Sequence, residues 1–71
     1  MTFQEILQAK MDARQWKPPH LSAHLITAGT YTTPQSIDHW LRGAAMPRAE
    51  TLRGLAKVFQ CSIEELLGGE L

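Results

Sequence analysis

The sequence predicts an all-α domain, a compact bundle of about five helices. Apolar residues recur at helical spacing in several segments, and prolines, glycines and capping residues separate those segments. No segment alternates apolar and polar residues as a strand does. A chain of 71 residues is long enough for one domain only, so we expect a single domain over residues 1–71.

The first helix is expected over residues 3–14. Thr2 and Glu5 have the spacing of a capping box, in which each side chain binds the backbone N–H of the other residue. Apolar residues then recur every three or four positions and share one face: Phe3, Ile6, Leu7 and Met11. This face should therefore be buried.

Prolines and glycines mark the next two helices. Pro19 suits the first turn of a second helix over about 19–28, which Gly29 would end as a C-terminal cap. After a short polar connection, Thr33 can cap a third helix and Pro34 can occupy its first position. A helix-turn-helix arrangement is thus expected over about 19–43.

The last two helices follow from a regular apolar pattern and a second capping signal. The fourth helix, over about 48–59, carries apolar residues at i, i+3, i+4 and i+7: Leu52, Leu55, Ala56 and Phe59. Ser62 and Glu65 have the spacing of another capping box, which would open a short fifth helix that stops at Gly68 and Gly69.

The third helix carries most of the functional information. At about 100° per residue, one face is apolar and holds Ile37, Trp40 and Leu41. The opposite stripe is polar and consists of Gln35, His39 and Arg42, with Ser36 and Asp38 on its flanks. The DNA major groove admits one helix, and Gln and Arg side chains pair with adenine and guanine there. The pattern also fits an ordinary surface helix.

Charge and composition narrow the classes of partner. The net charge is zero, with seven basic and seven acidic residues, which does not favour a strong overall positive field. The distribution is uneven. Residues 10–31 hold three basic residues against one acidic, residues 32–57 hold four against two, and the ends are acidic. A basic middle is compatible with a nucleic-acid partner.

The sequence gives little support for secretion, membrane insertion, metal binding or catalysis. The lone cysteine, Cys61, cannot form an internal disulfide, and no secretion signal or membrane span is recognisable, so we expect a cytoplasmic protein. His20 and His24 with Cys61 would make an incomplete metal site. No nucleophile, base and orienting residue form a set, and there is no phosphate-binding glycine loop, so we expect neither an enzyme nor a metal or cofactor.

From Leu21 to Leu67 the chain resembles the lambda-repressor-like, Cro/C1-type (XRE) helix-turn-helix family. The resemblance is strongest from Thr33 to Gly43, with a hydroxyl cap, polar positions, a buried isoleucine and an Arg-Gly ending. It continues in register through Pro47, Glu50-Thr51-Leu52, Leu55-Ala56-Lys57, Phe59 and Ser62-Ile63-Glu64-Glu65-Leu66-Leu67. It implies a bundle of about five helices that binds operator DNA.

The chain departs from the family pattern at four positions, three around the turn and one at the start of the third helix. Without a gap, Ile26 and Thr27 fall where the family has Leu-Ala, and Tyr31 falls where it has the glycine of the turn. Either Tyr31 adopts a positive φ or the turn is longer than usual, and we expect the longer turn. Pro34 offers no side-chain hydrogen bond at a position that the family often uses for reading bases.

The resemblance implies specific roles for residues around the third helix. The base-reading positions are Gln35, Ser36 and His39, and Thr32, Thr33 and Arg42 flank them near the phosphates. Arg48 follows the loop and is expected at the DNA backbone or in the minor groove. The start of the second helix should hold a phosphate through backbone N–H groups, with Lys17, His20 and Ser22. Each could instead be an ordinary surface residue.

The sequence therefore predicts a sequence-specific DNA-binding regulator, expected to act as a repressor and to associate with the nucleoid when bound. By the resemblance it is a homodimer on a palindromic operator, with half-sites roughly 34 Å apart. Self-association could use the fifth helix and Leu71. The alternative is an antitoxin-like module that binds a partner protein, which the neutral charge favours. Binding to DNA should weaken steeply with salt, and a protein contact much less.

Overall fold

The first helix, α1 (Phe3–Arg14), begins and ends at the predicted residues. The computed structural model describes residues 2–68. The capping box is complete, because Thr2 N–H donates to Glu5 Oε1 at 2.9 Å and Thr2 Oγ1 accepts the Glu5 N–H. These hydrogen bonds from Thr2 hold the pKa of Glu5 below its ordinary value. Leu71, which was expected to take part in self-association, lies outside the described residues.

The second and third helices, α2 (Pro18–Thr27) and α3 (Pro34–Leu41), differ from their predicted bounds by one or two residues. Gly29 ends α2 with a φ of 91°, as predicted for a C-terminal cap. The N–H of Thr30 donates to the carbonyl of Leu25 at 2.8 Å, which closes the end of the helix. This pattern is a Schellman motif. Its left-handed position suits glycine, which has no Cβ atom to strain the backbone there.

The turn between α2 and α3 is the longer one that we expected. Residues 28–33 connect the two helices, and Tyr31 is not one of the residues with positive φ in the described part of the chain. The buried residue of α2 in this region is Leu25, whereas Ile26 is 50% exposed. Leu25, and not Ile26, is therefore the residue by which this part of α2 enters the core.

The last two helices are α4 (Ala49–Phe59) and α5 (Ile63–Leu66). Ser62 caps α5 by accepting the Glu65 N–H at 3.0 Å, as expected. The expected capping box is only half present, because the Glu65 carboxylate instead pairs with Lys10 Nζ on α1 at 2.6 Å. The sequence prediction was wrong here because a cation 55 residues away competes for the same carboxylate.

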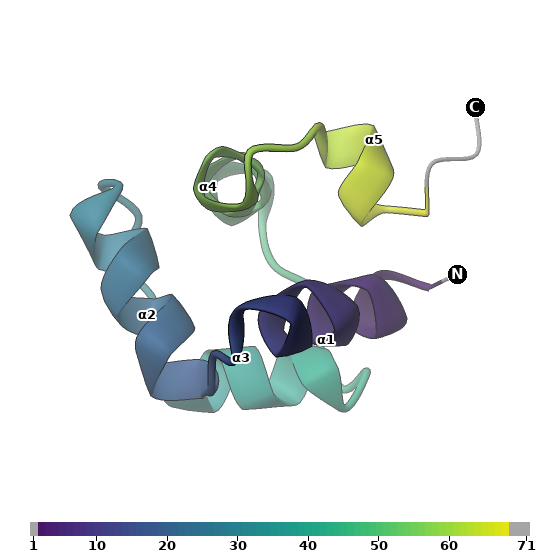
Figure 1. Ribbon diagram of the computed structural model, residues 1–71, viewed down its shortest axis with the longest axis horizontal. Coiled ribbons are helices and arrows are strands. Elements are labelled where there is room, and N and C mark those ends of the chain that lie inside the picture. Colours follow the sequence, from purple (N-terminus) through teal and green to yellow (C-terminus); the bar gives the residue numbers. More distant parts are fainter. Residues whose placement is uncertain (1, 69–71) are drawn as a thin grey trace.

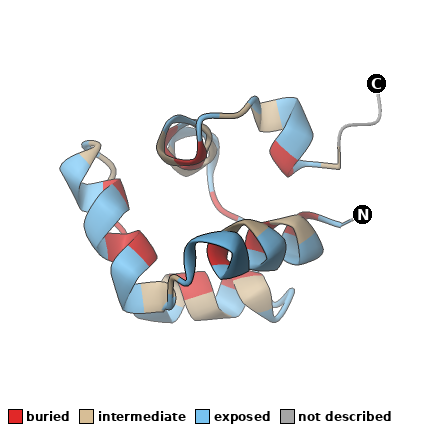
Figure 2. Cartoon of the chain, in the orientation of Figure 1, coloured by how far each residue is buried: buried red, intermediate tan, exposed pale blue. Residues whose placement is uncertain are grey.

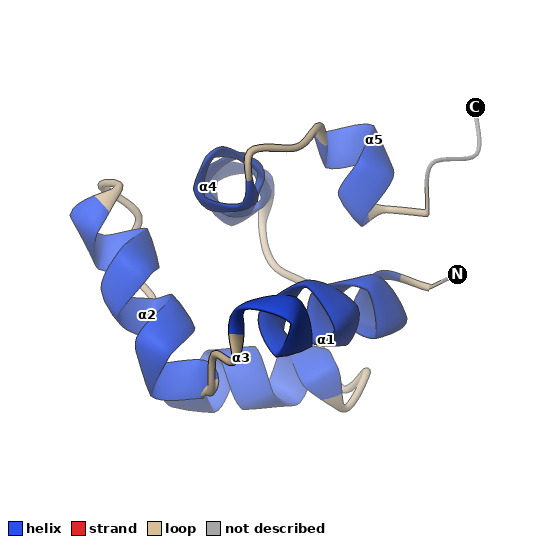
Figure 3. Ribbon diagram, viewed as in Figure 1, coloured by secondary structure: helices blue, strands red, loops and turns tan. Residues whose placement is uncertain are grey.

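The helices surround one core (Figure 1). In the described residues all regular structure is helical (Figure 3). Helix α3 packs against α1 and α2, and α4 packs against α2 and α5. The buried residues face inward from every helix (Figure 2). The buried apolar residues, which form the core, are Phe3, Leu7, Met11, Leu21, Leu25, Ile37, Trp40, Leu55, Phe59 and Leu66.

A close approach fixes the turn against α4. A Cβ added at Gly54 would lie 2.4 Å from Thr30 Oγ1 and 2.9 Å from Thr30 Cβ, so the absence of a side chain lets the turn reach the helix. The turn that precedes α3 is thereby packed on α4. No helix in the described part of the chain is long and apolar enough to cross a membrane.

Candidate nucleic-acid interface

The outer face of α3 is open, as the helical wheel predicted. Ile37 and Trp40 are buried beneath the helix, while Gln35 and His39 are exposed and Arg42 projects at its C-terminal end. No other residue of the described chain covers this row. Gln35, His39 and Arg42 therefore form a row of hydrogen-bonding groups on a helix that is anchored from its opposite side.

An ion pair orients the arginine of this row. Arg42 Nε lies 2.9 Å from Asp38 Oδ2, one turn earlier in α3. The two side chains are 72% and 44% exposed, and exposed pairs of this kind contribute about 0–1 kcal/mol. The pair can thus hold Arg42 along the helix in the free protein and exchange for a phosphate at little cost.

The hydroxyls at the start of α3 hold each other in place. Thr33 Oγ1 accepts the N–H of Ser36 at 3.1 Å, which is the predicted N-cap, and its own hydroxyl donates to Ser36 Oγ at 3.1 Å. The Thr33 hydroxyl is therefore used inside the cap. Ser36 Oγ, which is half-buried, still has its own proton to donate to a ligand.

Two residues that were predicted near the phosphates are buried. Ser22 and Thr32 are 5% and 7% exposed, and the Ser22 hydroxyl donates to the backbone carbonyl of Thr32 at 2.9 Å. The bond fixes the turn against α2 and satisfies a carbonyl that is buried there. The Ser22 hydroxyl is thus used within the fold, whereas the Thr32 side chain lines a pocket between α3 and α4.

The start of α2 also differs from its prediction. Pro18 and Pro19 have no N–H, the Lys17 N–H donates to His20 Nδ1 at 2.9 Å, and the N–H groups of His20 and Leu21 both donate to the Lys17 carbonyl. The expected backbone donors for a phosphate are therefore used within the helix. Only the exposed side chains of Lys17 and His20 are left for a ligand at this end.

At the start of α4, by contrast, backbone N–H donors are free in the described part of the chain. Its N-cap residue, Arg48, provides no side-chain acceptor, and within residues 2–68 no acceptor is found for the N–H groups of Ala49, Glu50 and Thr51. The positive end of the helix dipole adds to these donors. Sequence analysis missed this feature, although the lack of a capping residue at Arg48 was a visible signal.

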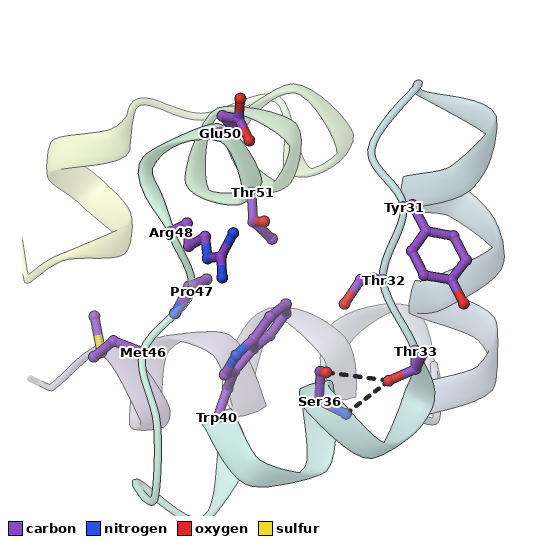
Figure 4. Close-up of a pocket in the computed structure, with 10 residues that line it drawn as sticks. All are labelled: Tyr31, Thr32, Thr33, Ser36, Trp40, Met46, Pro47, Arg48, Glu50 and Thr51. Carbon is purple, nitrogen blue, oxygen red and sulfur yellow. Dashed lines mark hydrogen bonds between the residues drawn. The ribbon is translucent and has the colours of Figure 1, made fainter.

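A pocket of about 370 Å³ joins the start of α4 to α3 and the turn. Arg48 extends into it from α4 above Trp40, Ser36 and Thr33 line the α3 side, and Tyr31 stands on the turn at its edge, with its ring directed away from Arg48 (Figure 4). The pocket thus combines a guanidinium, hydroxyls and the positive end of α4, with one carboxylate, that of Glu50, among its lining residues. This chemistry suits an anionic ligand.

The residues of the incomplete metal site are not gathered into a set of ligands in the described part of the chain. His24 stacks on Trp16 with ring centroids 4.2 Å apart, and His20 caps α2, so the two histidines do not form a site. Burial raises the pKa of the Cys61 thiol, which makes it a poorer metal ligand. Among the described residues, no three His, Cys, Asp or Glu side chains could hold a metal ion.

Comparisons with known proteins agree with this geometry. A helix-turn-helix family model matches residues 28–66, more than half of the chain. Among solved structures, the chain is similar to the P22 c2 repressor in its complex with a synthetic operator, with 26% identity, a TM-score of 0.82, and coverage of 99% of this chain and 98% of that chain. The curated proteins gave no match. The chain belongs to the Cro/C1-type helix-turn-helix family.

Proposed function

We propose that the protein is a sequence-specific DNA-binding regulator that represses transcription by occupying an operator, with α3 in the major groove. The observation that carries this proposal is the uncovered row of Gln35, His39 and Arg42 on a helix anchored by Ile37 and Trp40. The likeness to a repressor that was solved with operator DNA supports the same conclusion.

Each part of the surface has a distinct task in this proposal. Gln35, at the start of α3, pairs with adenine, and Ser36 and His39 contact neighbouring bases. Arg42 exchanges its bond with Asp38 for a phosphate. Base contacts give sequence preference, and phosphate contacts fix the position of the protein on the duplex.

The phosphate contacts come from the two sides of α3. Arg48 and the free N–H groups at the start of α4 bind the backbone on one side. The side chains of Lys17 and His20 bind it on the other, because the backbone donors of α2 are used internally. The protein acts as a homodimer on a palindrome with half-sites roughly 34 Å apart.

Selection from a random pool of double-stranded DNA tests the proposal. We expect one palindromic sequence to be enriched. The logarithm of the binding constant should fall linearly with the logarithm of the salt concentration. A scrambled duplex of the same composition is the control. A protein that enriches no sequence, yet captures a partner protein with little salt dependence, would instead be the interaction module that the sequence left open.

A further inference from the structure

Tyr31 is the most exposed of the large apolar side chains, at 79%, compared with 57% for Met46, 50% for Ile26 and 49% for Leu67. Its hydroxyl has no hydrogen-bond partner within residues 2–68. A tyrosine combines a large apolar ring with a polar tip and is enriched where proteins bind other molecules. Nothing in the fold accounts for an aromatic side chain at this place.

The backbone that carries Tyr31 is held on both sides. Before it, Thr30 lies against Gly54 of α4, and after it the Thr32 carbonyl accepts the buried hydroxyl of Ser22. The ring is thus presented by a fixed turn and has only two side-chain torsions to order on binding. Rigid presentation of this kind lowers the entropy cost of a contact.

Tyr31 also lines the same pocket as groups that can bind an anion. Arg48 extends into the same pocket from the opposite side, and Ser36 lines its α3 wall (Figure 4). A deoxyribose-phosphate chain fits this combination, because its sugar offers an apolar face to the ring and its phosphate accepts from hydroxyl and guanidinium groups. A purely apolar peptide would leave the guanidinium without a partner.

We propose that Tyr31 is an additional DNA-contacting residue, whose ring packs on a deoxyribose and whose hydroxyl donates to a phosphate of the strand that occupies this pocket. The inference rests on the proposed function and adds a contact to it. Because the contact is to the backbone, it raises affinity for all sequences and carries no base preference.

Fluorescence anisotropy with the selected duplex and its scrambled control tests this contact. Tyr31→Phe removes only the hydroxyl and should weaken binding to both duplexes about tenfold, the loss of one hydrogen bond to a charged group. Tyr31→Ala also removes the ring and should weaken both further. Ile26→Ala, which removes an exposed apolar side chain outside the pocket, is the matched control and should stay within about twofold.

The outcomes separate the inference from the proposed function. Selective binding by the wild type together with unchanged binding by Tyr31→Ala overturns the inference alone. Loss of binding to the selected duplex but not to the scrambled one also overturns it, since Tyr31 would then read bases. A wild-type protein that binds neither duplex overturns both proposals. Circular dichroism of each variant should show an unchanged helical fold.

Discussion

The starts of α2 and α4 flank the same helix, but they present different groups to a ligand. At α2 two prolines and the mutual bonds of Lys17 and His20 leave no backbone donor free among the first residues of the helix. At α4 three consecutive N–H groups, from Ala49 to Thr51, have no acceptor within residues 2–68. Two helix starts with the same dipole thus differ in whether they can bind an anion directly.

The difference shows that a helix start becomes an anion site only when its donors are free. A side-chain cap stabilises a helix by satisfying these same N–H groups, and a proline in the first turn removes one of them. A helix with an unsatisfied start, such as α4, gives up this stabilisation and keeps the donors for a ligand.

The largest expected effect comes from truncating the buried leucines that pack α2 and α4 into the core. Leu21 of α2 and Leu55 of α4 are fully buried, so Leu21→Ala and Leu55→Ala should each lower the free energy of unfolding by about 2–5 kcal/mol. Urea denaturation measures the change. Leu67→Ala, at an exposed position, should change it by less than about 0.5 kcal/mol. A more stable protein after either core substitution would contradict the packing.

The comparison itself is tested by removing one cation at each helix start. Arg48→Ala should weaken DNA binding by about 1.5–3 kcal/mol, because its guanidinium acts beside free backbone donors. Lys17→Ala should cost less than about 1 kcal/mol, because an exposed ammonium acts there without such donors. Binding isotherms at several salt concentrations measure both. A larger loss for Lys17→Ala would reverse our ranking of the two sites.

Adding a backbone N–H donor at the start of α2 should make that helix start more like the start of α4 as a binding site for an anion. Pro19→Ala adds one N–H in the first turn of α2, and we expect DNA affinity to rise by about 0.5–1 kcal/mol. The same change frees the unfolded chain and should cost about 0.4–1 kcal/mol of stability. Anisotropy and urea denaturation measure the two effects. Unchanged affinity would mean that no phosphate approaches the start of α2.

The smallest expected effect concerns α1, whose start carries the capping box of Thr2 and Glu5. Hydrogen bonds from Thr2 lower the pKa of Glu5 in the folded protein from its ordinary value of 4.5. The stabilisation is therefore complete above the unfolded pKa and is lost as the pH falls through the folded one. Denaturation midpoints of the wild type and Glu5→Gln should converge in acid. A difference that is independent of pH would show that the charge of Glu5 has no role.

Local signals were sufficient for the helices and for the outer face of α3. The Thr2–Glu5 box, the Thr33 cap and Gly29 are interactions between residues close in sequence, so their spacing predicted where α1 and α3 begin and where α2 ends. The periodicity of α3 likewise placed Ile37 inside and Gln35 outside. These features need no knowledge of the tertiary structure.

The predictions that failed concern groups whose hydrogen-bond partner lies far away in the sequence, or groups that had more than one possible partner. Glu65 binds Lys10 from another helix, and Ser22 binds a carbonyl in the turn, so neither side chain does what its local position suggests. Tertiary packing decides these cases.

The central claim is that the outer row of α3 reads base pairs. Repeating the selection from random DNA with Gln35→Ala tests it most directly, with Gln8→Ala on the exposed surface of α1 as the matched control. We predict that Gln35→Ala loses its preference at one or two base pairs of each half-site, a change of about 1–3 kcal/mol, while Gln8→Ala selects the wild-type sequence. An unchanged preference in Gln35→Ala would contradict the claim.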